Sequence, residues 1–168
     1  MKQVLFLLAA FLSLVAPAAA ANPQVGPSGL QLPRFVSLKS DRVNVRQGPS
    51  ADHKVAWTYL RAGLPVEITA EFDNWRKIRD SEGAEGWVQQ GLLSGRRTAL
   101  VAPWGKGKFF DLYARGRDDA AVKAKIESGV LVSLKLCNGS FCRVDAEKSE
   151  GFMKQNELWG VYENEKVE

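Results

Sequence analysis

The second half of the chain repeats the first half, and this duplication restricts the possible folds more than any other feature. Glycine turns at Gly63 and Gly129 stand 66 positions apart, and each precedes a segment of alternating apolar residues. The Glu-Gly-aromatic motifs that begin at Glu85 and Glu150 stand 65 positions apart. Because the two offsets agree within one residue, the sequence predicts two units of about 65 residues, with a boundary near residues 96–98.

Both units show the period-two pattern of β-strands. Apolar residues occupy every second position of two segments: Leu64, Val66, Ile68, Ala70 and Phe72 in the first unit, and Val130, Val132, Leu134 and Leu136 in the second. Such alternation is typical of half-buried strands, and we expect these residues to face inward. Helical periodicity is scarce, and we interpret its best candidate, residues 118–127, as a loop followed by a strand. The chain is therefore predicted to be all-β, with each unit a small bent barrel or sandwich.

The first 21 residues have the pattern of a secretory signal peptide. Lys2 precedes an apolar core at residues 4–12, and alanines 18–21 supply a cleavage zone of small residues. The core is short for a membrane span. We expect cleavage after Ala20 or Ala21, export to the periplasm or beyond the cell, and no stable membrane insertion of the mature chain. Residues 22–33 hold three prolines and two glycines, which predicts a flexible leader.

The charge balance argues against one class of partner. Residues 1–21 contain a single charged residue, Lys2, so the remaining chain has 22 basic and 19 acidic residues, a net charge of +3. A nucleic-acid-binding protein of the usual cationic kind is more basic than this. Residues 22–98 hold the whole of this excess, whereas residues 99–168 are neutral. Any anionic ligand is therefore expected to meet the first unit.

Several motifs of the first unit together resemble the bacterial SH3-like domain family. They are, in order, residues 43–50 (VNVRQGPS), 62–63 (AG), 74–75 (NW), 85–88 (EGWV) and 92–94 (LLS). The second unit resembles the family less closely, since Phe141 and Phe152 stand where the first has Trp75 and Trp87. The resemblance implies two tandem SH3-like β-barrels, at residues 34–97 and 98–165. A signal peptide followed by two such units is also similar to a group of exported proteins of Gram-negative bacteria.

The two cysteines, Cys137 and Cys142, flank the hairpin turn signal Asn138-Gly139. In an exported chain, a close pair of cysteines predicts a disulfide bond. A metal site would need two further ligands, and the lone histidine, His53, is distant in sequence. Cys137 is out of phase with the inward series at positions 130–136. A direct bridge therefore requires a four-residue loop or a local bulge.

Aromatic residues of the first unit are the candidate ligand contacts, because an aromatic face can stack on a sugar ring or a peptide plane. Trp75 is out of phase with the inward Ile78, so we expect it to be partly exposed, and basic neighbours could assist it. The predicted ligand-binding residues are Trp57, Tyr59, Trp75, Arg76 and Lys77. By contrast, we interpret Trp87 as a core residue, since Phe152 keeps an aromatic ring at the repeated position. Arg46 recurs as Arg115, which favours a role in holding a turn.

Catalysis has little support in the sequence. The chain has one histidine and lacks a nucleophile elbow, a phosphate-binding glycine loop and a metal-ligand cluster, so we expect no catalytic residues, cofactor or metal. Domains of the family that the chain resembles commonly target peptidoglycan or its peptide stems. The resemblance therefore implies a non-catalytic cell-envelope binding module. The alternative is a periplasmic scaffold that binds another protein through a groove or a strand edge. The oligomeric state stays open.

Overall fold

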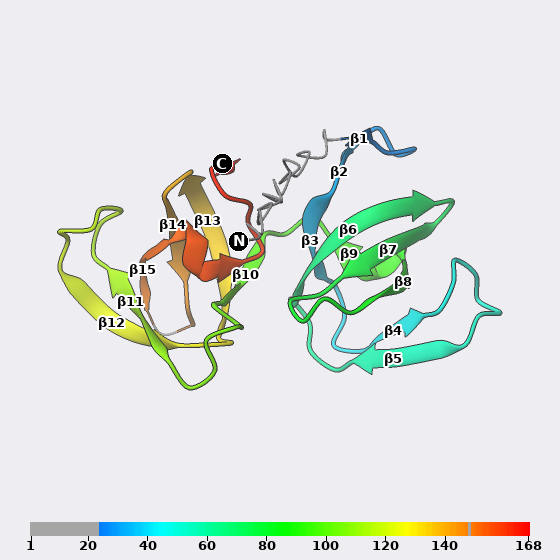
Figure 1. Cartoon of the computed structure of the whole chain (residues 1–168), viewed down its shortest axis with the longest axis horizontal. Helices are drawn as coiled ribbons and strands as arrows, with labels where there is room; N and C mark the ends of the chain where they lie inside the picture. Colours follow the sequence, from blue (N-terminus) through cyan, green and yellow to red (C-terminus); the bar gives the residue numbers. More distant parts are fainter. Residues whose placement is uncertain (1–23, 148) are drawn as a thin grey trace, which may run out of the picture.

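The computed structural model describes residues 24–147 and 149–168, which form a short hairpin and two β-sheet units (Figure 1). The predicted signal peptide, residues 1–21, lies outside the described residues. Among the residues described, no helix is long and apolar enough to cross a membrane.

Both units are built from short strands. Within the described residues, the strands of the first unit are β3 (Arg34–Leu38), β4 (Val43–Arg46), β5 (Val55–Tyr59), β6 (Pro65–Phe72), β7 (Trp75–Arg79), β8 (Glu85–Gln89) and β9 (Leu93–Ser94). Those of the second unit are β10 (Thr98–Val101), β11 (Phe109–Tyr113), β12 (Val122–Glu127), β13 (Leu131–Asn138), β14 (Phe141–Asp145), β15 (Glu150–Lys154), β16 (Leu158–Trp159) and β17 (Lys166–Val167). Single-turn 3-10 helices, η1 (Gln90–Leu92) and η2 (Gln155–Glu157), precede β9 and β16.

The strand order confirms the predicted duplication. The first sheet runs β5-β4-β8-β7-β6-β3-β9, and the second runs β12-β11-β15-β14-β13-β10-β16, the same order strand for strand. β17 is an addition that pairs with β13. The all-β class is confirmed, and the segment at residues 118–127 is a loop followed by a strand, as expected, with β12 beginning at Val122.

A β-bulge interrupts the long strand of each unit at the equivalent place. The register of β6 against β7 shifts between Ile68 and Ala70, and that of β13 against β14 shifts between Leu134 and Leu136. An extra residue reverses the inward-outward alternation beyond it. Phe72 and Leu136, which we expected to face inward, are therefore 53% and 47% exposed. The predicted inward positions of Phe72 and Leu136, the last residues of the two series, were wrong for this reason.

The bulge in β13 resolves the phase problem of the predicted disulfide. Beyond the bulge, Cys137 turns inward and lies directly opposite Cys142 in the β13–β14 hairpin. The two sulfur atoms are 2.03 Å apart, and both cysteines are buried in the core of the second unit. The predicted disulfide is confirmed, and of the two alternatives, a four-residue loop or a local bulge, the structure has the bulge.

Each unit has its own hydrophobic core. The core of the first consists of Leu38, Val43, Val45, Val66, Ile68, Ile78 and Val88. The core of the second is larger, and its fully buried side chains include Val101, Leu112, Val132, Val144 and Met153. The inward position expected for Ile78 is confirmed.

Residues 24–33 form a hairpin rather than the flexible leader expected from the sequence. β1 (Gln24–Val25) pairs with β2 (Gln31–Leu32), and Ser28 in the turn donates from its backbone amide and its hydroxyl to the Glu71 carboxylate, both at 2.8 Å. Arg34 forms an ion pair with the same carboxylate at 2.6 Å. Glu71 thus ties the hairpin to β6.

The two units are joined by a three-residue link, residues 95–97, and by direct contacts. The Thr98 hydroxyl donates to the carbonyl of Gly63 at 2.7 Å. The ring of Phe35 lies 5.2 Å from the Trp159 ring and 4.7 Å from the Tyr162 ring. Side chains of both units therefore form a common interface.

Candidate functional site

The five predicted ligand contacts lie on two different sides of the first sheet. Directly paired residues of neighbouring strands share a face. Trp57 pairs with the core residue Val45, and Tyr59 pairs with the core residue Val43. Trp57 and Tyr59 therefore cover the core side, half-buried, with their rings packed edge to face at 6.1 Å.

The hydroxyl of Tyr59 is committed to the fold. It donates a 2.7 Å hydrogen bond to Asp80. Burial, together with this hydrogen bond, raises the pKa of Tyr59 above its ordinary value. Tyr59 therefore stays neutral at physiological pH, with its polar end already occupied.

Arg76 lies in the interior. It is 5% exposed, its Nε lies 3.2 Å from the Glu71 carboxylate, and it donates to the carbonyls of Asp73 and Trp75, both at 2.8 Å. A third acceptor, the side-chain oxygen of Gln90, lies beside its other terminal nitrogen. The structure thus places the Arg76 guanidinium among internal partners.

Trp75 and Lys77 lie on the outer face of the sheet, together with Trp87. Lys77 pairs with Trp87 in the β7–β8 ladder, and Trp87 pairs with Arg46 across β8 and β4. Trp87 is half-buried on this face, so the prediction of a core position was wrong. Gly86 and Val88 take the inward positions of β8 instead. The alternation of β8 itself was the signal that could have placed Trp87 outside.

Trp75 borders a cavity of about 290 Å³, which we call the Trp75 groove. Its lining residues are Arg42, Asn44, Arg46, Ala51, Trp75, Gln89 and Leu92. Arg46 is oriented by donating to the carbonyl of His53 at 2.6 Å. Arg42 is exposed and forms no ion pair within the part of the chain that the structure describes. The groove thus combines two guanidinium groups, two side-chain amides and an indole ring.

This combination suits a ligand that has carboxylate, amide and flat or ring-shaped parts. Guanidinium groups bind carboxylates through paired charged hydrogen bonds. The amides of Asn44 and Gln89 both donate and accept, as a peptide backbone requires. The Trp75 ring offers apolar surface for stacking.

The equivalent face of the second unit is filled by its own aromatic rings. Phe141, the counterpart of Trp75, is 7% exposed and packs edge to face against Tyr113 at 5.9 Å. Gly116 packs so closely here that a Cβ at this position would lie 3.1 Å from the Phe152 ring and 3.3 Å from Phe141. The second unit therefore lacks an open tryptophan surface at this place.

The register also corrects one proposed equivalence. Arg46 pairs with Trp87, whereas Phe152, the counterpart of Trp87, pairs with Tyr113. The structural counterpart of Arg46 is therefore Tyr113 and not Arg115. The first unit therefore has an arginine at the position where the second unit has Tyr113.

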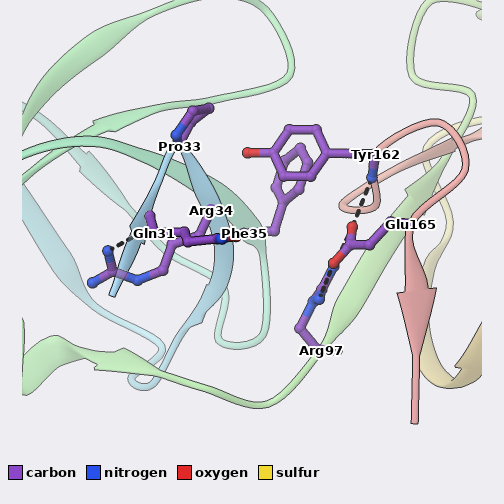
Figure 2. Close-up of a pocket in the computed structure, with 7 residues that line it drawn as sticks. All are labelled: Gln31, Pro33, Arg34, Phe35, Arg97, Tyr162 and Glu165. Atoms are coloured by element: carbon purple, nitrogen blue, oxygen red, sulfur yellow. Dashed lines mark hydrogen bonds and ion pairs between the residues drawn. The ribbon is translucent and has the colours of Figure 1, made fainter. Parts of the chain in front are cut away.

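A second cavity, of about 450 Å³, lies between the two units (Figure 2). It is lined by Gln31, Pro33, Arg34, Phe35, Arg97, Tyr162 and Glu165. Arg97 pairs with Glu165 at 2.6 Å, and Arg34 donates to the carbonyl of Gln31 at 3.2 Å. Because Arg34, Arg97 and Glu165 already have partners, we interpret this cavity as part of the interface that joins the units.

A resident metal has no ligand set in the described part of the chain, where no cluster of three or more histidine, cysteine, aspartate or glutamate side chains could hold an ion. The lone histidine, His53, packs its ring against Gly48.

Solved structures that the chain matches include two from Trichomonas vaginalis, "Structure of NlpC2" and "Structure of NlpC1", at 11% and 12% identity and TM-scores of 0.35 and 0.36. They cover 79% and 88% of this chain and 50% of each of those chains. An NlpC/P60 family protein from Bacillus cereus has 12% identity, a TM-score of 0.33, and coverage of 74% of this chain and 55% of that chain. The chain thus spans about half the length of these structures. No curated protein matches it.

The family comparison agrees with the duplicated strand order. The family model described as "Bacterial SH3 domain" matches residues 39–95 and again residues 106–160, one match in each unit. Both matches fall within the two sheets described above. The chain therefore belongs to the bacterial SH3 domain family, with two copies of the domain in tandem.

Proposed function

We propose that the protein is a non-catalytic cell-envelope binding module that recognises the peptide stems of peptidoglycan through the Trp75 groove. The observation that supports this most directly is the contrast between the two units. Trp75 borders an open cavity next to Arg42 and Arg46, whereas its counterpart Phe141 is packed among other rings. Membership of the bacterial SH3 domain family supports a cell-wall-related binding role.

The chemistry of the groove fits such a ligand. Peptidoglycan stems are short peptides with free carboxylates, and they are attached to sugar rings. The guanidinium groups of Arg42 and Arg46 would bind a stem carboxylate, and the amides of Asn44 and Gln89 would bind its peptide groups. The indole of Trp75 would stack on the adjoining sugar ring or peptide plane. The signal-peptide pattern of residues 1–21 supports a periplasmic location, where this ligand occurs.

A periplasmic scaffold role is the second candidate, and one observation favours it. β5 forms the end of the first sheet, so one side of its backbone is unpaired within the described sheet. Val55 on this strand is 43% exposed and the adjacent Leu60 is 73% exposed. An extended segment of a partner protein could add to such an edge.

The test is retention on purified peptidoglycan sacculi. We expect Trp75→Ala to lower the affinity about fivefold to 150-fold, a loss of about 1–3 kcal/mol, as is common for an aromatic contact. Leu60→Ala is the matched control, because Leu60 is exposed on the same unit and does not line the groove. Circular dichroism establishes that each variant is folded.

Two outcomes would contradict the proposal. Unchanged retention of a folded Trp75→Ala protein would remove Trp75 from the site. Retention that disappears at moderate salt in the wild type would indicate general charge attraction to the wall instead of a specific site. If Leu60→Ala alone loses retention, the wall-binding surface lies at the β5 edge and not in the Trp75 groove.

A further inference from the structure

The loop between β10 and β11, residues 102–108, together with Phe109, forms an exposed surface that the proposed function does not use. Trp104 is 63% exposed and Phe109 is 60% exposed. Lys106 and Lys108 between them are also exposed and form no ion pair with any residue that the structure describes. We call residues 102–109 the Trp104 loop. Two large apolar side chains and two free cations are thus presented on one short segment.

The Trp104 loop is specific to the second unit. In the first unit, β3 ends at Leu38 and β4 begins at Val43, which leaves a four-residue connection. In the second unit, β10 ends at Val101 and β11 begins at Phe109, which leaves seven residues. The first unit therefore has no counterpart of the exposed tryptophan.

Hydrogen bonds hold the Trp104 loop in its outward position. The backbone amide of Gly105 donates to the carbonyl of Ala102 at 2.8 Å, and the backbone amide of Lys108 donates to the carbonyl of Gly105 at 2.9 Å. The Ser128 hydroxyl also donates to the carbonyl of Ala102, at 2.8 Å. The Phe110 ring supports the loop from beneath, since a Cβ on Gly105 would lie only 2.9 Å from it. An ordered loop loses little conformational freedom when it binds.

The shape and charge of the Trp104 loop favour a flat, anionic and partly apolar partner. Neither Trp104 nor Phe109 lines any of the cavities described above, and the loop projects from the end of its sheet in Figure 1. A projecting tip does not enclose a small molecule. Tryptophan and phenylalanine rings insert at the level of lipid headgroups, and neighbouring lysines attract anionic lipids. Glu127, which pairs with Phe109, is the acidic residue directly opposite the end of the loop, and it forms no ion pair with either lysine among the described residues.

We propose that the Trp104 loop docks the second unit on the surface of an anionic lipid bilayer. The docking is peripheral: the two rings enter the headgroup region, and the lysines remain at the charged surface. This surface belongs to the second unit and the Trp75 groove belongs to the first, so the two binding events use separate residues.

The test is co-sedimentation of the protein with lipid vesicles. The protein used begins at residue 22, which keeps every described residue and removes the apolar segment 4–12 that could bind lipid by itself. One vesicle contains equal amounts of phosphatidylglycerol and phosphatidylcholine, and the other contains phosphatidylcholine alone. We expect binding to the first vesicle and at least tenfold weaker binding to the second, because each lysine near an anionic surface contributes about fivefold or more.

Two double variants separate the apolar and the charged contributions. Trp104→Ser with Phe109→Ser should weaken binding to the anionic vesicle about tenfold or more, because the inserted rings are lost. Lys106→Gln with Lys108→Gln should remove most of the preference for the anionic vesicle. All four positions are exposed, so the variants are expected to fold, as circular dichroism can verify.

The matched controls lie in the first unit. Phe72→Ser removes an aromatic ring that is 53% exposed, and Lys54→Gln removes an exposed cation. Both should bind vesicles like the wild type. Absence of binding to the anionic vesicle, or equal losses in the control and loop variants, would overturn the proposal. Loss of sacculus retention by the Trp104→Ser, Phe109→Ser variant without loss of vesicle binding would overturn it too, and would assign the loop to the cell wall.

Discussion

The hydroxyl of Tyr162, in the second unit, donates a 2.8 Å hydrogen bond to Oε1 of Glu67, in the first unit. The other carboxylate oxygen of Glu67 accepts from Nε of Arg79 at 2.8 Å, and the Glu67 side chain is only 3% exposed. Burial raises the pKa of the Tyr162 hydroxyl above its ordinary value, and the hydrogen bond from Tyr162 to Glu67 raises it further. Because a buried carboxylate needs partners for its oxygens, the folding of each unit depends partly on the presence of the other.

Tyr162→Phe should therefore destabilise the protein. The variant leaves one oxygen of a buried carboxylate without its partner, which typically costs about 1–3 kcal/mol. Urea unfolding at neutral pH measures the loss. Tyr113→Phe is the matched control, because Tyr113 packs against Phe141 and its hydroxyl donates no hydrogen bond to a described residue. Equal stabilities of the two variants would show that the Tyr162–Glu67 bond contributes nothing measurable.

Glu71 should make the attachment of the N-terminal hairpin sensitive to acid. Burial by itself would raise the pKa of Glu71, but hydrogen bonds from Ser28 and Arg34 outweigh it and lower the pKa to about 2 from an ordinary 4.5. A lowered pKa in the folded state contributes stability above the unfolded value. This contribution is complete above about pH 4.5 and is lost as the pH falls toward about 2.

Thermal unfolding as a function of pH checks this prediction. The unfolding temperature of the wild type should fall across that acidic range more steeply than that of Glu71→Gln, which lacks the titrating group. Parallel pH profiles for the two proteins would exclude Glu71 as a source of the acid sensitivity.

Gly151→Ala should destabilise the second unit. A Cβ at this position in β15 would lie 2.7 Å from Cγ of Leu112 and 2.7 Å from the carbonyl oxygen of Tyr113. Relieving such overlaps requires displacement of a packed strand, which costs about 1–3 kcal/mol. Gly91→Ala is the control, since a Cβ there meets no atom within 4 Å. Chemical denaturation of both proteins gives the comparison, and similar stabilities would contradict the predicted close packing of β15 on β11.

Removal of the disulfide should have a modest effect on stability. The bridge closes a short loop, with a sequence separation of 5, so its entropic contribution is about 2 kcal/mol on the chain-entropy model. The double variant Cys137→Ala, Cys142→Ala should therefore fold with a lower urea midpoint. Mass spectrometry of the wild type purified without reductant should find no free thiol, and two free thiols would refute the bridge.

The fold could be predicted largely from the sequence because the same motifs occur in the same order in both halves of the chain. Glycine turns, strand alternation and the Glu-Gly-aromatic motif all depend on local backbone geometry, which sequence patterns report well. The β-bulges could not be predicted in this way. An inserted residue such as Thr69 or Lys135 changes which side chains face inward beyond it, although the alternation in the sequence continues unbroken.

The site was only partly predictable, because its composition depends on contacts between distant strands. The expectation that Trp75 is partly exposed agrees with its position on the outer face. Trp57 and Tyr59 lie on the opposite side, since their partners across the ladder are the core residues Val45 and Val43. Arg76 shares the inward side of β7 with Ile78, but its charge partner Glu71 lies on the neighbouring strand β6 and could not be inferred from one strand alone.

The link between the units, residues 95–97, spans only three positions, and the buried hydrogen bond from Thr98 to the carbonyl of Gly63 follows it directly. Domains on a long flexible tether search space independently, and each binding event then incurs its own cost in orientational freedom. Here, capture of one unit delivers the other in a fixed direction and at a fixed separation. Such an arrangement discriminates between surfaces by their spacing: two layers bind both units together only if the gap between them matches the length of the molecule.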